Sequence, residues 1–205
     1  ITAGPTYEAI DPVRFIGNRS TGKMGYALAA ACAQAGARVL LVSGPTALPT
    51  PAGVHKISVE SAEEMHTATM EHWPNASIGI FSAAVADYKP QHVASEKIKK
   101  TNASLQIQLT PTTDILAAAG KSKKTGQFLV GFALETENEV AHARGKLERK
   151  NADLIVLNSL RDAGAGFGHD TNQVQLIAPH EEVSLPLATK DEIAQKIVAY
   201  ICKHV

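Results

Sequence analysis

The chain has 205 residues, with 20 Lys and Arg against 20 Asp and Glu, so its formal net charge at pH 7 is zero. It therefore lacks the basic field that non-specific nucleic-acid binding requires, which argues against DNA as a partner. Hydrophobic residues make up 44% of the chain, as in an ordinary globular protein. Two cysteines are too few for a disulfide scaffold and fit a reducing, cytoplasmic setting.

Neither a membrane segment nor a signal peptide is recognised in the sequence. The longest nearly uncharged apolar run, residues 78–86, is far shorter than the ~20 residues of a membrane-spanning helix. The first residues, ITAG, are typical of the end of a buried strand. We therefore expect a single domain over residues 1–205 whose first strand is truncated at Ile1, with a missing fused domain as the alternative.

Strand patterns alternate with helix patterns along the chain. Helices are predicted at 24–37, 61–73, 114–122, 139–152 and 191–205, with Ser61 and Glu64 as a capping box before the second. The alternation predicts a Rossmann-like, doubly wound α/β sheet, mostly parallel, with helices on both faces and its ligand site at the carboxyl ends of the strands. Strands are predicted at 1–4, 38–44, 55–59, 77–83, 104–109, 128–134 and 153–159, with a C-terminal β-hairpin at 172–179 and 182–189.

The stretch GNRSTGKM, residues 17–24, matches the phosphate-binding pattern G-x-x-x-x-G-K-[ST] except at Met24. A P-loop follows its strand directly, and its hydroxyl ligates magnesium. Here about a dozen residues separate the first strand from Gly17, and a methionine cannot replace the hydroxyl. The pattern therefore argues against a P-loop hydrolase. It leaves a Gly- and Ser-rich turn before a helix, which can offer backbone N–H groups to an anion.

Eight segments occur in the order and approximate spacing of one enzyme family: ITAGPT, DPVRFIGNRSTGKMGYALA, LVSGP, AAVADYKP, EKIKK, VGFALET, KNADLIVLN and GFGHDTNQV. In these segments the chain resembles phosphopantothenoylcysteine synthetase, in its bacterial nucleotide-dependent form, across nearly its whole length. Enzymes of this family join 4′-phosphopantothenate to L-cysteine in coenzyme A biosynthesis. The resemblance implies CTP as cosubstrate with Mg²⁺, an acyl-cytidylate intermediate, and release of pyrophosphate and CMP. It also implies a homodimer, and it raises fusion to a phosphopantothenoylcysteine decarboxylase domain.

The resemblance assigns the loop around residues 14–18 to the phosphopantothenate side. It implies that Arg14 contacts the phosphate of this substrate and that Ala84 is a further substrate contact. Asn18 matches a residue that binds the intermediate and assists its second half-reaction, since an amide can donate to an oxyanion without adding charge. Lys97 matches a lysine at the triphosphate, where an ammonium balances charge, and it is implied to be catalytic together with Asn18.

The nucleotide side is implied by the later segments. Asp87 would contact ribose or magnesium, and Phe132 would pack against the base or simply belong to the core. The chain reads TTD where the family often has Asn-Pro-Asp, which leaves the backbone path there open. Lys146 and Lys150, four residues apart, can share one helix face. The implied nucleotide-binding set is Phe81, Ser82, Ala83, Asp87, Lys97, Thr113, Asp114, Ile115, Leu116, Phe132, Lys146 and Lys150.

Two other function classes compete with the ligase. A dinucleotide-binding dehydrogenase is disfavoured because GAGFG at 164–168 lacks the G-x-G-x-x-G spacing and its strand and helix context. The eight histidines show no ligand spacing for a metal centre. A non-catalytic nucleotide-sensing module stays open, and it would bind CTP without releasing pyrophosphate.

Overall fold

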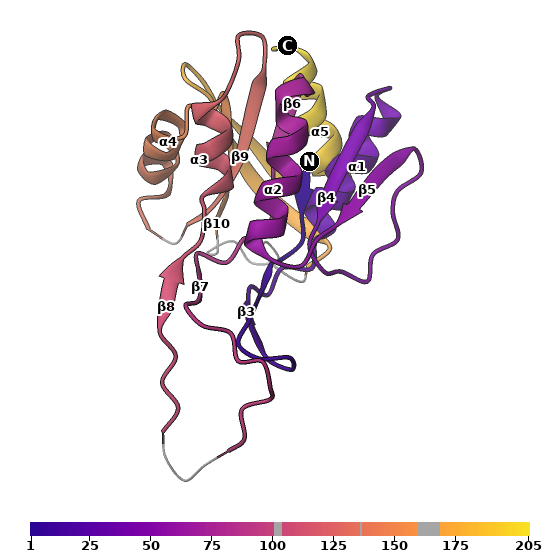
Figure 1. Cartoon of the computed structure of the whole chain (residues 1–205). Helices are drawn as coiled ribbons and strands as arrows, with labels where there is room; N and C mark the ends of the chain where they lie inside the picture. Colours follow the sequence, from indigo (N-terminus) through magenta and orange to yellow (C-terminus); the bar gives the residue numbers. More distant parts are fainter. Residues whose placement is uncertain (101–103, 136, 160–168) are drawn as a thin grey trace.

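The computed structural model describes residues 1–100, 104–135, 137–159 and 169–205. Its centre is an eight-stranded sheet with the order β12-β11-β10-β9-β6-β1-β4-β5 (Figure 1). Neighbouring strands from β10 to β5 run parallel, and β11 and β12 add an antiparallel hairpin at one edge, so the predicted architecture is confirmed. The strands are β1 (Thr2–Ala3), β4 (Val39–Ser43), β5 (Val54–Ser58), β6 (Ile78–Phe81), β9 (Phe128–Glu135), β10 (Leu154–Ser159), β11 (Thr171–Ile177) and β12 (Glu182–Thr189).

Helices cover both faces of this sheet. Ile80, Val130 and Val156 point to the face covered by α1 and α5. Leu129 and Ile155, their neighbours along the strands, point to the face covered by the other helices. Because successive strand residues alternate between faces, burial on both sides explains the unbroken apolar runs in the sequence. The helices are α1 (Lys23–Gln34), α2 (Ala62–His72), α3 (Ile115–Lys121), α4 (Glu139–Arg149) and α5 (Lys190–Cys202), with a 3-10 turn, η1 (Trp73–Asn75).

Side-chain caps fix where three of the helices begin. Ser61 Oγ accepts from the N–H of Glu64 at 3.2 Å, as the predicted capping box requires, but the Glu64 carboxylate accepts from the N–H of Glu60 at 2.7 Å. Asp114 caps α3, and Thr189 caps α5 in a complete capping box, so α5 begins at Lys190 rather than at 191. Within the described ranges, no helix combines the length and the apolar character needed to cross a bilayer.

An arm projects from the carboxyl edge of the sheet, and the sequence did not predict it (Figure 1). It comprises the described parts of residues 7–17 and 88–111, and contains two antiparallel ribbons, β2 (Tyr7–Ala9) with β3 (Phe15–Gly17), and β7 (Tyr88–Pro90) with β8 (Leu109–Pro111). The predicted strand at 104–109 is wrong, since residues 104–108 form no regular element. Leu105 and Ile107 alternate with polar residues, but both are exposed on the arm rather than turned toward a core.

Candidate active site

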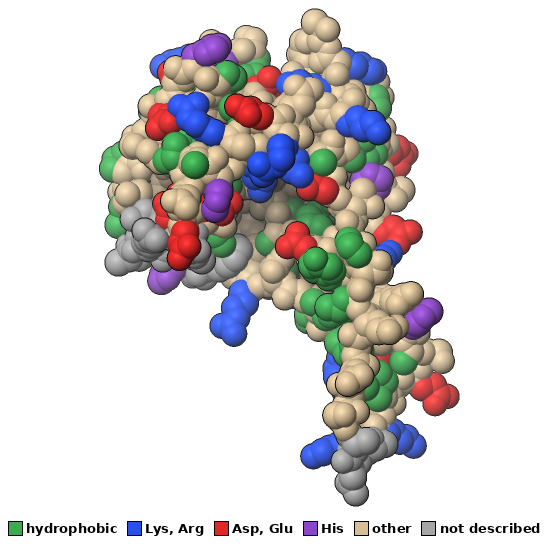
Figure 2. Space-filling model, turned by 90° about the vertical axis from the view of Figure 1, so that its left-hand side faces the viewer, with side chains coloured by type: hydrophobic (Ala, Val, Ile, Leu, Met, Phe, Trp, Pro, Cys, Tyr) green, Lys and Arg blue, Asp and Glu red, His purple; other side chains and the backbone are tan. Residues whose placement is uncertain are grey.

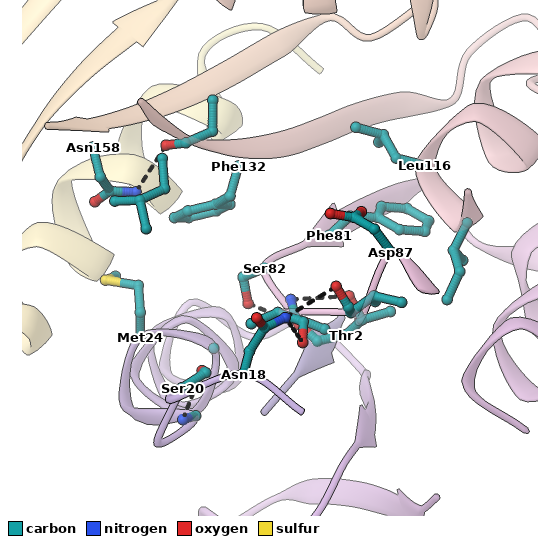
Figure 3. A pocket seen from close by; sticks show the side chains of 18 of the residues that line it. Thr2, Asn18, Ser20, Met24, Phe81, Ser82, Asp87, Leu116, Phe132 and Asn158 are labelled. Carbon is teal, nitrogen blue, oxygen red and sulfur yellow. Dashed lines mark hydrogen bonds between the residues drawn. The ribbon is translucent and has the colours of Figure 1, made fainter. Parts of the chain in front are cut away.

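A cavity of about 580 Å³ lies at the carboxyl edge of the sheet (Figure 3). The chain runs from β1 outward to β4 and β5 and then returns to β6 on the other side of β1. The strand order therefore reverses between β1 and β6, and doubly wound sheets bind their ligands at such a point. Thr2 of β1, Phe81 of β6, Phe132 of β9 and Asn158 of β10 line this space.

Glycines allow the backbone segments below the cavity to approach closely. Gly4, after β1, has a φ of +76°, and a Cβ built on Gly44, after β4, would lie 1.7 Å from the carbonyl oxygen of Pro5. A Cβ on Gly25 would lie 2.4 Å from the Cβ of Ala3, so the first turn of α1 packs directly on β1. This packing brings the loop before α1 to the edge of the cavity.

The turn before α1 is open to an anion. The N–H groups of Lys23, Met24 and Gly25 have no acceptor within the described residues, and Gly22, with φ 79°, provides no side-chain cap. Unpaired N–H groups at the start of a helix attract negative charge. The hairpin β2–β3 separates β1 from this turn, so the chain path differs from that of a P-loop, as the sequence predicted.

The structure brings most of the predicted site residues to this one cavity. Phe81, Ile115 and Leu116 also have their side chains in the core under α2, α3 and α4, which leaves them little surface for a ligand. Phe132 is half-buried. The predicted residues that line the cavity are Asn18, Phe81, Ser82, Ala83, Ala84, Asp87, Thr113, Asp114, Ile115, Leu116, Phe132 and Lys146.

Asn18 connects the turn before α1 to the loop after β6. Its Nδ2 donates to the carbonyl oxygens of Ala84 at 2.9 Å and Val85 at 3.1 Å (Figure 3). The predicted contact between this amide and an intermediate would therefore have to replace one of the two hydrogen bonds. In the described structure, Asn18 fixes the distance between two walls of the cavity.

Basic and acidic side chains interact at the α3–α4 end of the cavity. Lys146 Nζ donates to the carbonyl oxygen of Phe132 at 2.7 Å, and burial lowers the pKa of this lysine below its ordinary value. Lys150 does not line the cavity, but its Nζ lies 2.6 Å from Oδ2 of Asp114. Burial acts to raise the pKa of Asp114, but the hydrogen bonds from Lys150 and from the N–H of Ala117 outweigh it and hold the pKa below the usual range.

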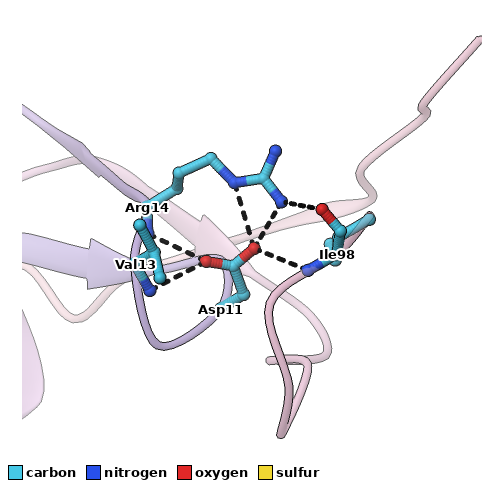
Figure 4. A network of polar contacts seen from close by, with 4 residues as sticks. All are labelled: Asp11, Val13, Arg14 and Ile98. Atoms are coloured by element: carbon cyan, nitrogen blue, oxygen red, sulfur yellow. Dashed lines mark hydrogen bonds and ion pairs between the residues drawn. The ribbon is translucent and has the colours of Figure 1, made fainter. Parts of the chain in front are cut away.

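Arg14 and Lys97 are the predicted residues that lie on the arm, outside the cavity of their own chain. Arg14 Nη2 donates to the carbonyl oxygen of Ile98 at 2.9 Å, and Asp11 Oδ2 accepts from the N–H of Ile98 at 3.1 Å (Figure 4). Asp11 also accepts from the Nε of Arg14 at 3.0 Å. This network holds the segment that carries Lys97 next to Arg14, although the two residues are far apart in the sequence.

Asp87 is the acidic residue of the cavity that is available to a cation. Its carbonyl oxygen accepts from the N–H of Thr112 at 2.9 Å, whereas its carboxylate forms no hydrogen bond or ion pair among the described residues and acts on Lys146 through its charge. No group of three or more His, Cys, Asp and Glu in the described ranges is arranged to hold a metal ion. Mg²⁺ commonly binds through one or two carboxylates together with substrate phosphates. One carboxylate without a hydrogen bond or ion pair, in this cavity, fits that pattern.

Several cavity residues were not singled out from the sequence. Asn158 Nδ2 donates to the carbonyl oxygen of Ala133 at 3.3 Å and its Oδ1 accepts from the buried Asn172 at 2.7 Å, while Lys23 and Lys190 form part of the cavity wall near α1. An Asn that ends the apolar run DLIVLN was a usable signal, because a polar residue at the carboxyl end of a parallel strand faces the ligand edge. Lys190 gave no such signal, since only the fold brings α5 to this edge.

Comparison with known proteins places the chain in a family. The family described as "DNA/pantothenate metabolism flavoprotein C-terminal domain" matches residues 1–205. The coenzyme A biosynthesis bifunctional protein CoaBC of Vibrio cholerae serotype O1 is 49% identical over 203 residues, which are 98% of this chain and 51% of that protein. A protein named cysteine/cysteine sulfinic acid decarboxylase, from an unknown prokaryotic organism, is 50% identical over 203 residues, which are 98% of this chain and 56% of that protein.

A solved structure agrees with these matches. The crystal structure of the C-terminal domain of a coenzyme A biosynthesis bifunctional protein CoaBC superposes with a TM-score of 0.83 at 45% identity, covering 98% of this chain and 91% of that one. The chain spans about half the length of the curated relatives it matches. It belongs to the family of the DNA/pantothenate metabolism flavoprotein C-terminal domain, and its resemblance to phosphopantothenoylcysteine synthetases is thereby confirmed.

Proposed function

We propose that this chain is a phosphopantothenate–cysteine ligase that uses CTP. The carboxylate of 4′-phosphopantothenate attacks the α-phosphate of CTP, which forms an acyl-cytidylate and releases pyrophosphate. The amine of L-cysteine then attacks the acyl carbon, an amide forms and CMP leaves. The observation that carries the proposal is the cavity at the sheet reversal, where Asn18 and Ala84 of the phosphopantothenate side face the same space as Phe132 and Lys146 of the nucleotide side.

The arrangement suits a reaction that activates a carboxylate. A mixed anhydride is readily hydrolysed, so it must be held between walls that exclude water and orient the amine. Asn18 ties the turn before α1 to Ala84 and Val85 and thereby fixes the geometry around the reacting carbon. Lys146 reaches the cavity from α4 and supplies positive charge for the nucleotide.

Mg²⁺ would be held at Asp87 together with the phosphates of CTP. Asp87 lines the cavity, and its carboxylate forms no hydrogen bond or ion pair among the described residues. When bound, the ion would neutralise charge on the phosphates. Lys97 is proposed to serve the same purpose from the arm.

The deciding experiment measures pyrophosphate release from CTP and, separately, from ATP, with 4′-phosphopantothenate present and cysteine added or withheld. We expect release with CTP that cysteine stimulates. A preference for ATP would keep the ligase and overturn the choice of nucleotide. Binding of CTP without release of pyrophosphate would instead favour the nucleotide-sensing module.

Nucleotide binding is expected to weaken at alkaline pH because of Lys146. Burial lowers the pKa of this lysine, so it loses its charge at a lower pH than an exposed lysine does. The affinity for CTP should therefore fall as the pH rises through that lowered pKa. Titration calorimetry across the alkaline range tests this, with Lys146→Arg as control, because a guanidinium remains charged throughout. An equally steep fall in the Arg variant would show that another group titrates.

We also propose that the chain forms a homodimer through the arm. Hydrophobic side chains lie along the arm in Figure 2, and Val13, Phe15, Tyr88, Val93, Leu105 and Leu109 are all between 47% and 59% exposed. Large contiguous apolar surfaces mark interaction sites. Arg14 and Lys97 lie on this arm and outside their own cavity, so pairing through the arm would offer them to the cavity of the partner.

Charges introduced on the arm should dissociate this dimer. We expect the double variant Leu105→Glu and Leu109→Glu to sediment as a monomer at micromolar concentration, whereas the unchanged chain sediments as a dimer. Leu187→Glu is the matched control, because Leu187 is 49% exposed but lies on the edge strand β12 of the main sheet. A monomeric unchanged chain, or a control that dissociates equally, would contradict the interface.

We propose, finally, that the enzyme is cytoplasmic and that a phosphopantothenoylcysteine decarboxylase domain accompanies this domain. Support for the second domain comes from the relatives, which are named bifunctional proteins and are about twice as long as the part that matches this chain. Mass determination of the protein isolated from its natural source would test the fusion.

A further inference from the structure

Two lysines form one wall of the cavity, at the opposite end from Lys146. Lys23 is the first residue of α1, and Lys190 is the first residue of α5. Lys190 is only 8% exposed, and its Nζ donates to the carbonyl oxygen of His169. Both lysines also line a second hollow of about 440 Å³ that lies between α1, the start of α5 and Leu48. The two lysines therefore lie between the cavity and the second hollow.

The charges around these lysines are unevenly placed. Lys23 Nζ lies 2.5 Å from Oδ1 of Asp170, and the Asp170 side chain is 85% exposed. Asp170 and Asp191 line the second hollow, and neither lines the cavity. Of the charged residues of this cluster, the two lysines therefore line the cavity as well as the second hollow, whereas the two carboxylates line the second hollow alone.

The position of Lys190 disfavours a positive charge. The start of a helix carries partial positive charge, which repels an ammonium group at the first helical residue. Burial removes water from the same group and Lys23 adds a second positive charge, and together they lower the pKa of Lys190 although Asp170 acts to raise it. A cation held in such a place is stabilised when an anion enters the adjoining cavity.

We propose that Lys23 and Lys190 are positioning residues for the terminal phosphates of a nucleoside triphosphate, and that Asp170 is the internal counter-charge that a bound polyphosphate replaces at Lys23. The inference rests on the proposed function, because it identifies which end of the cavity receives the pyrophosphate that leaves CTP. Two neighbouring ammonium groups match a polyanion better than the single carboxylate of cysteine. The unpaired N–H groups of Lys23, Met24 and Gly25 would add donors for the same phosphates.

The test compares the binding of pyrophosphate, CTP and CMP, each with Mg²⁺, by titration calorimetry. Lys190→Met and Lys23→Met are each expected to weaken the binding of pyrophosphate and of CTP about tenfold or more, the usual scale for a lost hydrogen bond to a charged group. The affinity for CMP should remain nearly unchanged. Lys196→Met is the matched control, because Lys196 lies exposed on α5 and does not line the cavity. Lys190→Arg should retain pyrophosphate binding, which separates loss of charge from loss of folding.

Asp170→Asn supplies a test of opposite sign. Without its internal partner, Lys23 should bind pyrophosphate more tightly, by a few-fold, and the Lys23→Met change should abolish this gain. Equal weakening of CMP and pyrophosphate in the lysine variants, unchanged pyrophosphate binding, or weaker binding in Asp170→Asn would overturn the proposal. A chain that turns over CTP while the lysine variants bind pyrophosphate normally would refute this inference alone. A chain that binds pyrophosphate through these lysines but releases none from CTP would refute the proposed function alone.

Discussion

Replacing Asp11 with alanine is expected to slow the release of pyrophosphate from CTP about 100-fold, the scale on which misplaced groups reduce catalysis. Asp11 is buried in the turn between β2 and β3 and accepts from the N–H groups of Val13 and Arg14, both at 2.9 Å, and from that of Ile98 at 3.1 Å. The Arg14 guanidinium, which donates to the same carboxylate, holds the pKa of Asp11 far below its usual range.

The reason for the large effect is that one carboxylate holds both residues that the arm would contribute to catalysis. Without it, Arg14 loses its ion pair, and the segment around Ile98 that carries Lys97 loses an anchor. The α/β body contains none of these contacts, so its unfolding transition should remain close to that of the unchanged chain. We therefore expect Asp11→Ala to lose activity while its α/β body remains folded.

Glu63→Ala serves as control, because Glu63 pairs with Lys89 of the arm at 2.8 Å while its side chain is 75% exposed. Exposed ion pairs contribute little to the stability of a structure, so loss of this pair should change turnover less than twofold. If Asp11→Ala retained turnover within the same twofold, the arm geometry would be irrelevant to the reaction. The depressed pKa also sets the sign of the pH effect: the contribution of Asp11 is fully present above the ordinary Asp pKa of about 3.9 and is lost as the pH falls through its lowered folded value.

The main sheet could be predicted from sequence because burial on both faces leaves a local pattern. Runs such as those around Leu41, Val130 and Ile155 are apolar at every position, and the turns between them are marked by glycine and proline. The arm left no such pattern. Its strands Tyr7–Ala9 and Phe15–Gly17 are three residues long and bury little, so neither hydrophobic period nor propensity separates them from loops.

The site was predictable where a resemblance named the residues, and less so where only the fold brings them together. Asn18 and Lys146 are far apart in the sequence, and no periodicity places them at one cavity. Lys190 begins a helix whose sequence is typical of an amphipathic surface helix, and only the fold brings its side chain near Lys23 of α1 and the carbonyl oxygen of His169. Arg14 and Lys97 were predicted as site residues, but their own chain places them on the arm, so their role stays a prediction that depends on the dimer.

Substituting Gly44 by alanine is expected to lower the free energy of unfolding by about 3 kcal/mol, the upper part of the usual range for overpacking. The added Cβ would lie 1.7 Å from the carbonyl oxygen of Pro5, and the obstacle is backbone rather than a movable side chain. The turn after β1 would have to move away from the turn after β4. Urea unfolding should show a lower midpoint with an unchanged slope.

Gly145→Ala distinguishes this clash from a general effect of replacing glycine. A Cβ at Gly145 meets Nη1 of Arg149 at 2.7 Å, which is the far end of a flexible side chain. Alanine also favours a helix interior over glycine by up to about 1 kcal/mol, so this variant should be as stable as the unchanged chain or more stable. If both variants were equally stable, the close approach of the two turns would not limit the fold.

The Gly44 variant should also bind CTP more weakly, because the displaced turn is hydrogen-bonded to Ala84, which lines the cavity. The carbonyl oxygen of Gly4 accepts from the N–H of Ala84 at 2.9 Å, and the N–H of Thr6 donates to the carbonyl oxygen of Ala84 at 3.4 Å. Asn18 donates to that same carbonyl oxygen. A shift of residues 4–6 therefore moves the loop on which both substrate sides depend, so stability and nucleotide affinity should fall together in Gly44→Ala, and neither should fall in Gly145→Ala.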